Sequence, residues 1–164
     1  EALTNLLEIG YRIIVMCAYN HQIFERGWRL LRKQSEDLVK KNDLALLCST
    51  DTRTSKTSAT AARAKLQTEN KNIIREIKFG NTDTDGYMRD EITKFIISNP
   101  ENVHPKPQTI LVIVDPERVK PLASTLAKNA HHPEHSKITR MSIRPCGAIL
   151  IEKTGIRYVD AIRD

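Results

Sequence analysis

The spacing of apolar residues changes after Asn99, and this change constrains the fold more than any other feature of the chain. Before Asn99, apolar residues recur three and four positions apart, which is the spacing of one helical face. Three prolines between residues 100 and 107 then interrupt the helical pattern, and strand-like runs follow. The sequence therefore predicts an α+β protein, with a helical, coiled-coil-like assembly region over residues 1–99 and a small domain over residues 108–164.

A long seam of apolar residues runs through the start of the helical region. Most positions spaced three and four apart between Leu3 and Ala45 are apolar, and no proline precedes Pro100. A seam of this length is typical of helices that pack against a partner helix. We therefore expect a homo-oligomer whose helices contact one another through Leu7, Ile14, Phe24, Trp28, Leu31 and Leu38.

Two more helices are expected before the prolines. One covers residues 59–79, with an apolar face, a basic face and Gly80 as its C-cap. The next covers residues 86–98 and follows Asp83 or Asp85 as N-cap. The apolar residues that this helix is expected to bury are Met88, Ile92, Phe95 and Ile96.

The second half of the chain reads as strand, helix, strand and strand. TILVIV at 109–114 and AILIE at 148–152 are continuous apolar runs, which is typical of strands covered on both faces. ITRMSIR at 138–144 alternates instead, which predicts an edge strand with one basic face. The helix between the first two strands has Pro121 in its first turn, and a second helix is expected after Gly155. Its expected buried residues are Val119, Leu122, Ala123 and Leu126.

This order of elements matches a ferredoxin-like plan of the kind found in RNA-recognition motifs, without the last strand. Such motifs stack bases on aromatic residues of their central strands, whereas residues 109–114 and 148–152 hold aliphatic residues. Base stacking on this sheet is therefore not expected. An aliphatic sheet favours packing against protein.

The charge balance of the chain favours an anionic partner. The formal net charge is +6 and the pI is about 9.3, which suits contact with the phosphates of RNA or single-stranded DNA. The simpler alternative is that these lysines and arginines are only solvated surface residues. The residues that we expect to contact nucleic acid are Arg140, Arg144, Lys153 and Arg157 in the domain, with Arg63 and Lys71 on the preceding helix.

The string SKITRMSIRPCGAILIEKTG, which follows TILVIVDPE and one helix, resembles the RNA-recognition-like domain of Gag-like proteins from insect non-LTR retrotransposons. The matching positions are residues 138–144, Gly147 and residues 149–152. In such proteins this domain follows a helical or coiled-coil region and precedes zinc knuckles that bind nucleic acid. The resemblance implies a nucleic-acid-associated assembly role, although this sequence contains no zinc knuckle.

Other motifs are incomplete. The pattern Asn81-x-Asp83-x-Asp85-Gly86 imitates half of a calcium loop, but its twelfth position is Ile92 rather than a glutamate, so we interpret it as a helix-capping turn. The cluster HHPEH at 131–135 is interpreted as a solvated turn with no metal role. The three cysteines are far apart and do not form a metal or disulfide pattern, which favours a reducing compartment.

Taken together, these patterns predict a non-enzymatic, nucleic-acid-associated assembly protein of Gag-like or nucleoprotein-like type. A protein-interaction scaffold or polymerase cofactor without direct nucleic-acid contact remains the alternative. No phosphate-loop, dinucleotide, zinc-protease or serine-hydrolase motif occurs, so no catalytic residue and no cofactor are expected. No apolar stretch is long enough to span a membrane, and we expect an intracellular protein of the cytoplasm or nucleus.

Overall fold

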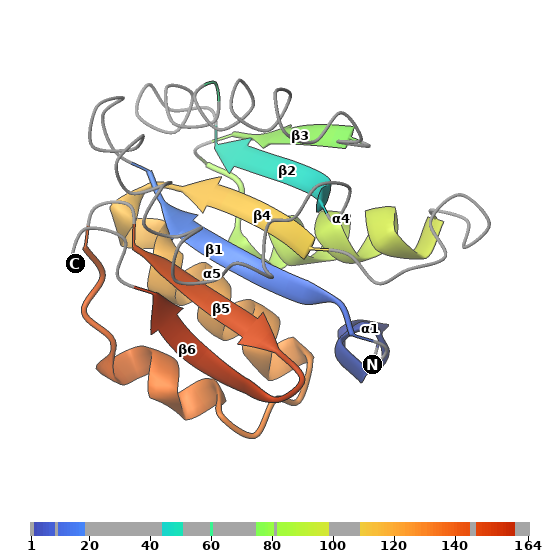
Figure 1. Ribbon diagram of the computed structural model, residues 1–164. Coiled ribbons are helices and arrows are strands. Elements are labelled where there is room, and N and C mark those ends of the chain that lie inside the picture. Colours follow the sequence, from blue (N-terminus) through green and yellow to red (C-terminus); the bar gives the residue numbers. More distant parts are fainter. Residues whose placement is uncertain are drawn as a thin grey trace.

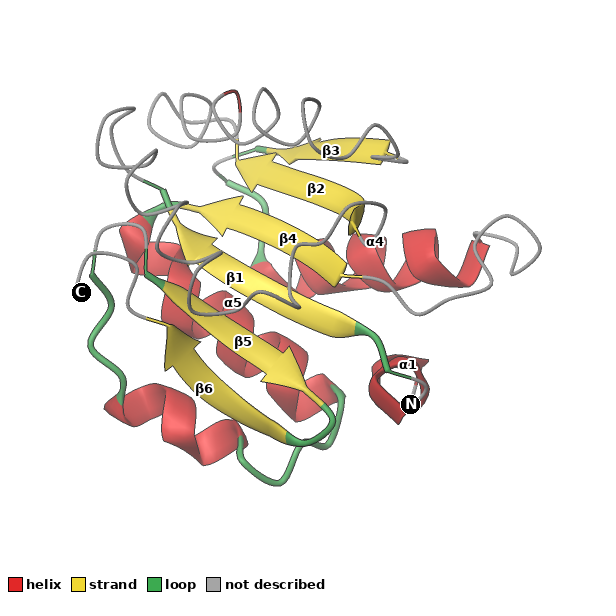
Figure 2. Ribbon diagram, viewed as in Figure 1, coloured by secondary structure: helices red, strands yellow, loops and turns green. Residues whose placement is uncertain are grey.

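Strands from both halves of the chain form one mixed six-stranded sheet in the order β3-β2-β4-β1-β5-β6 (Figures 1 and 2). The computed structural model describes residues 2–8, 10–18, 44–50, 60, 75–80, 82–98, 109–144 and 147–159. The elements are α1 (Ala2–Glu8), β1 (Arg12–Cys17), β2 (Leu44–Thr50), β3 (Arg75–Phe79), α4 (Asp85–Ser98), β4 (Thr109–Val114), α5 (Pro116–Asn129), the 3₁₀-helix η1 (His135–Arg140), β5 (Ala148–Glu152) and β6 (Gly155–Val159).

The centre of the sheet is built from apolar strands. β3, β2, β4 and β1 run parallel to one another, and β5 and β6 continue the sheet in antiparallel pairs. Every residue of β4 is buried, as are the last five residues of β1. Continuous Val, Ile and Leu runs suit strands that are covered on both faces. The strands expected at 109–114 and 148–152 are therefore confirmed.

Helices α4 and α5 lie on the same side of the sheet (Figure 1). The apolar face of α5 is buried through the four residues expected from the sequence, Val119, Leu122, Ala123 and Leu126. Met88 and Ile92 of α4 and Leu3 of α1 join the same core. Helices α4 and α5 thus begin beside β3 and β4, and both return across the same face of the sheet.

Helices α1 and α5 end in the same hydrogen-bonded motif. After α1, the N–H groups of Gly10 and Tyr11 donate to the carbonyls of Leu7 and Leu6, both at 3.0 Å. After α5, His131 and His132 donate in the same way to Lys128 and Ala127, both at 3.0 Å. This Schellman motif requires a left-handed residue, and the φ angles are 106° at Gly10 and 54° at His131.

The prediction of a helical assembly region over residues 1–99 is wrong for the strands that the structure describes there. Residues 12–17 form β1, which lies between β4 and β5, so the regions 1–99 and 108–164 share one sheet. The run Arg12–Cys17 is short and rich in β-branched residues, and pairing on both sides outweighs its helical spacing. Residues 44–50 and 75–79 are also strands: β2 pairs with β4 and β3, and β3 pairs with β2. The expected boundary at residues 100–107 lies outside the described residues.

The expected oligomer contacts also change. Leu7 is 4% exposed and Ile14 is 0% exposed within the single chain, so neither side chain is available to a second subunit. The other expected contacts and the basic helix residues lie outside the described residues; they are Phe24, Trp28, Leu31, Leu38, Arg63 and Lys71.

Three expectations about the C-terminal half are wrong. Residues 138–144 form the end of η1 and an irregular segment, because Ile138 points into the core from η1 and is 0% exposed. Residues 155–159 form β6, because a short turn returns the chain to pair with β5. Pro121 lies in the second turn of α5, which begins at Pro116, and its carbonyl accepts the Thr125 hydroxyl at 2.9 Å.

The predicted α+β class is thus confirmed only in its coarse form, as a chain that combines helices with strands, and the observed strand order differs from the ferredoxin-like one. In that plan the strands at 109–114 and 148–152 would belong to a separate small sheet. Here β1 is inserted between them and pairs with both.

Candidate functional site

The carboxyl ends of the parallel strands meet at one edge of the sheet, which we call the carboxyl edge. The register pairs Cys17 with Val114, and Thr50 with Phe79. β5 is antiparallel to β1 and therefore begins at this edge, where Ala148 lies opposite Met16. In open α/β sheets, ligands bind outside the carboxyl ends of the strands. The carboxyl edge is therefore the candidate site.

Backbone hydrogen bonds fix the middle of the carboxyl edge. The N–H of Ala18 donates to the carbonyl of Val114, and the N–H of Cys17 donates to the carbonyl of Gly147, both at 2.8 Å. Ala18 is 0% exposed, whereas the next residue after β4, Asp115, is partly exposed. The ends of β4 and β1 and the start of β5 are thus held at fixed positions.

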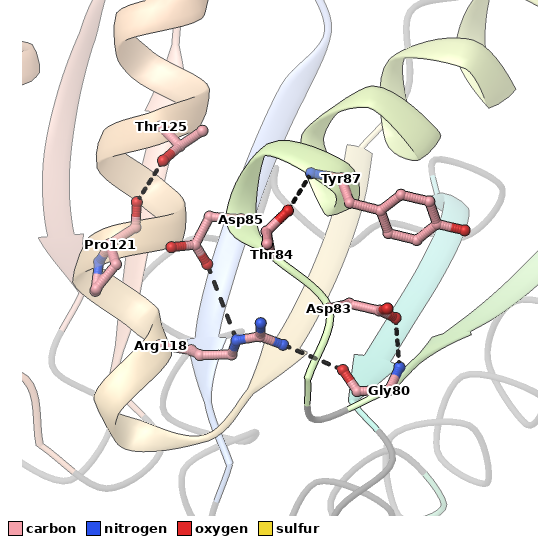
Figure 3. Close-up of polar contacts among 8 residues, drawn as sticks. All are labelled: Gly80, Asp83, Thr84, Asp85, Tyr87, Arg118, Pro121 and Thr125. Atoms are coloured by element: carbon pink, nitrogen blue, oxygen red, sulfur yellow. Dashed lines mark hydrogen bonds and ion pairs between the residues drawn. The ribbon is translucent and has the colours of Figure 1, made fainter.

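One side of the carboxyl edge is a polar cluster around Arg118, from the first turn of α5 (Figure 3). Its Nη1 donates to the carbonyl of Gly80 at 3.4 Å, and its Nε lies 3.9 Å from Asp85 Oδ1. The Gly80 N–H donates to Asp83 Oδ2 at 2.6 Å. Arg118 therefore connects the start of α5 to the turn between β3 and α4. Its partner Gly80 is 38 residues away in sequence, so no local pattern could have indicated this contact.

The N-cap of α4 is Thr84, not Asp83 or Asp85. The Thr84 hydroxyl accepts the Tyr87 N–H at 3.1 Å, as a threonine N-cap does. Asp83 instead closes the preceding turn on Gly80, so the calcium-like pattern forms a capping turn. Across the described residues, His, Cys, Asp and Glu side chains do not gather in groups of three that could hold a metal ion.

The other side of the carboxyl edge is the turn before β5, which holds Arg144 next to Tyr158. The backbone N–H of Arg144 donates to the Tyr158 hydroxyl at 2.9 Å. The Gly147 N–H donates to the Arg144 carbonyl at 2.9 Å, which closes the turn. The side chain of Arg144 is exposed. This turn thus presents a cation at the carboxyl edge.

The residues expected to contact nucleic acid are exposed where they are described, but they are not gathered at one place. Arg144 lies at the carboxyl edge. Lys153 lies in the β5–β6 turn at the opposite edge, where its Nζ is 2.9 Å from Glu8 of α1. Arg140 ends η1, and Arg157 lies on β6.

The histidine cluster is not a solvated turn throughout. His132 is 4% exposed. Its Nδ1 accepts the Glu134 N–H at 3.0 Å, so the proton resides on Nε2, which donates to the Glu152 carbonyl at 2.8 Å. His132 therefore joins the end of α5 to the β5–β6 hairpin. Its burial follows from its position in the Schellman motif, which the sequence pattern did not indicate.

The comparisons with known proteins reveal a likeness in fold. The structure resembles the crystal structure of phosphoglycerate mutase from Plasmodium falciparum, with a TM-score of 0.54 and 12% sequence identity. The match covers 94% of this chain and 93% of that chain. No protein-family model matches the sequence, and no curated protein is similar to it in sequence.

This likeness corrects two expectations. It covers nearly the whole chain with the fold of one α/β protein, so it contradicts the resemblance to Gag-like retrotransposon proteins. It also contradicts the expectation of a non-enzymatic protein, because the fold is one that an enzyme adopts.

Within the described parts of the chain, no helix combines the length and apolar character that a membrane span requires.

Proposed function

We propose that the chain binds a small phosphorylated molecule at the carboxyl edge of its parallel strands. One observation carries the proposal: β3, β2, β4 and β1 end together, at the edge where α/β proteins bind their ligands. The ligand class follows from the likeness to phosphoglycerate mutase, whose name indicates a phosphorylated substrate.

The charge at this edge supports an anionic ligand. Arg144 is exposed there, and a guanidinium forms strong paired hydrogen bonds with phosphate. Arg118 is 16% exposed and is directed at Gly80 and Asp85, so its role is to hold the edge together. The net charge of +6 adds a general attraction for anions.

Calorimetric titration with 3-phosphoglycerate tests the proposal, with glycerate as the control that lacks the phosphate. Binding of the phosphorylated compound alone is expected. Arg144→Ala should weaken binding about tenfold, because it removes a charge-assisted hydrogen bond. The matched variant Lys153→Ala, at the opposite edge, should bind normally.

Backbone amide NMR shifts locate the ligand independently. Ala18, Gly80 and Asp115 at the carboxyl edge should shift on titration, whereas Arg12 and Thr109 at the other ends of their strands should not. Phosphorus NMR of the same sample would report transfer or release of phosphate. Equal shifts at both edges, or no binding of any phosphorylated compound, would overturn the proposal.

Nucleic-acid binding is the second candidate, because Arg140, Arg144, Lys153 and Arg157 are all exposed. A polyanion that spans these residues would contact several phosphates, and its affinity would fall steeply with salt. Titration of a single-stranded RNA in rising salt separates the candidates. A steep fall in RNA affinity with rising salt concentration, made less steep by both Arg144→Ala and Lys153→Ala, would favour nucleic acid.

Assembly into a homo-oligomer remains a prediction, which light scattering would test.

A further inference from the structure

A tyrosine hydroxyl of β6 holds Arg144, in the turn before β5, against the sheet. Tyr158 lies on β6, and its Oη accepts the backbone N–H of Arg144 at 2.9 Å. The same turn is closed by the hydrogen bond from Gly147 N–H to the Arg144 carbonyl. Both backbone polar groups of Arg144 are therefore engaged, which fixes where its side chain begins.

Gly147 allows the tyrosine to reach this position. A β-carbon on Gly147 would collide with the Tyr158 hydroxyl and would lie 2.7 Å from the ring carbon that bears it. Real β-carbons do not approach other atoms so closely, so any side chain at residue 147 would displace the tyrosine. Close approach of a ring to the backbone is one of the uses of glycine.

The attachment continues into the central strands. The Gly147 carbonyl accepts the Cys17 N–H at 2.8 Å, and Ala18 beside it is bonded to Val114 at the end of β4. A series of hydrogen bonds thus runs from Tyr158 through Arg144 and Gly147 to the middle of the carboxyl edge. β6, the last strand of the sheet, is in this way connected to the candidate site.

We infer that Tyr158 is a positioning residue, which holds Arg144 at the carboxyl edge to receive the phosphate of a phosphorylated ligand. This inference rests on the proposed function. The tyrosine acts through the backbone of Arg144, so its effect on ligand binding requires the Arg144 guanidinium.

Tyr158→Phe removes the hydroxyl and keeps the ring. We expect the dissociation constant for 3-phosphoglycerate to rise about fivefold, the change expected for one lost hydrogen bond. In an Arg144→Ala background the same substitution should leave the dissociation constant unchanged, because no guanidinium remains to be positioned. Tyr11→Phe, immediately before β1 at the opposite ends of the parallel strands, is the matched control and should bind normally.

The outcomes distinguish this inference from the proposed function. If Arg144→Ala does not weaken binding, the proposed site is wrong. If Arg144→Ala weakens binding but Tyr158→Phe does not, the site stands and the positioning role is wrong. An equal effect of Tyr158→Phe with and without Arg144 would also overturn the inference, because a general loss of structure would act in both backgrounds.

Discussion

The carboxylate of Glu134 accepts the backbone N–H of Ile156 at 3.0 Å, on the outer edge of the last strand. An edge strand with free N–H groups is a template for aggregation, and natural proteins cover such edges. The Glu134 Oε1 also accepts the Lys137 ammonium at 2.7 Å, and the Glu134 N–H donates to His132. These hydrogen bonds of residues 132–137 therefore hold η1 beside β6, although this segment does not add another strand to the sheet.

Low pH should weaken the interactions of the Glu134 carboxylate with Lys137 and Ile156. The pKa of Glu134 is lowered chiefly by the hydrogen bond from Lys137 and then by the Ile156 N–H. A lowered pKa contributes stability above the unfolded pKa, about 4.3 for Glu, and this contribution is lost as the pH falls through the folded value. The melting temperature of Glu134→Gln should thus lie below that of the wild type at pH 7, and the gap should narrow when the pH is lowered to 3. A gap of the same size at both pH values would contradict the ionic explanation.

The two Schellman motifs predict that introducing a glycine at one left-handed position stabilises the protein, and that removing a glycine from the other destabilises it. His131→Gly should stabilise the protein by about 0.5–1 kcal/mol, because a left-handed backbone strains a residue with a β-carbon. Gly10→Ala should destabilise it by about 1 kcal/mol for the same reason. Urea unfolding measures both, with Lys128→Ala as a surface control in the last turn of α5. A loss of stability in His131→Gly would show that the imidazole makes a needed contact.

A β-carbon at residue 147 should be costly. Gly147→Ala is expected to destabilise the protein by about 1–3 kcal/mol, the range for overpacking. Tyr158→Phe should not rescue it, because two ring carbons at 2.7 and 2.9 Å from the added atom remain. In a Tyr158→Val background the cost should shrink, since the ring is gone. Equal costs in all three backgrounds, measured by urea unfolding, would mean that the collision is not with Tyr158.

Arg118 should matter more than a surface arginine. Arg118→Met leaves Asp85 without its nearby cation and should cost about 1 kcal/mol in unfolding free energy. Arg118→Lys should recover part of this through charge alone, because lysine lacks the planar fork of donors. The matched variant is Arg89→Met, whose partner Asp90 is 69% exposed, and it should cost almost nothing. Equal losses in the two methionine variants would argue against a structural role for Arg118.

Some elements could be predicted because their information is local. The strands at β4 and β5 follow from apolar runs that are bounded by turn residues, and the buried face of α5 follows from its spacing. Thr84 begins α4 by a local capping contact, although the sequence left Asp83 and Asp85 as the candidates. Arg144 was expected to contact phosphate, and its position at the carboxyl edge agrees with the proposed ligand site, but the binding itself stays a prediction.

Other elements could not be predicted because their partners are distant in sequence. The run at 12–17 fits a helical face as well as a strand, and pairing with residues 109–114 and 148–151 decides between them. Residues 138–144 alternate like a strand, yet Ile138 enters the core from η1 and the chain passes β6 without pairing. Arg118 and Tyr158 carry no motif, since each gains its role only from a contact across the fold.

Local sequence patterns were therefore enough to predict the apolar strands β4 and β5, the buried face of α5 and a fold that combines helices with strands, because propensity and periodicity act over a few residues. The tertiary structure decided the sheet order, the carboxyl edge and the attachment of Arg144 to Tyr158. These depend on hydrogen bonds between segments far apart in the chain, whose free energy becomes available only when the whole sheet forms.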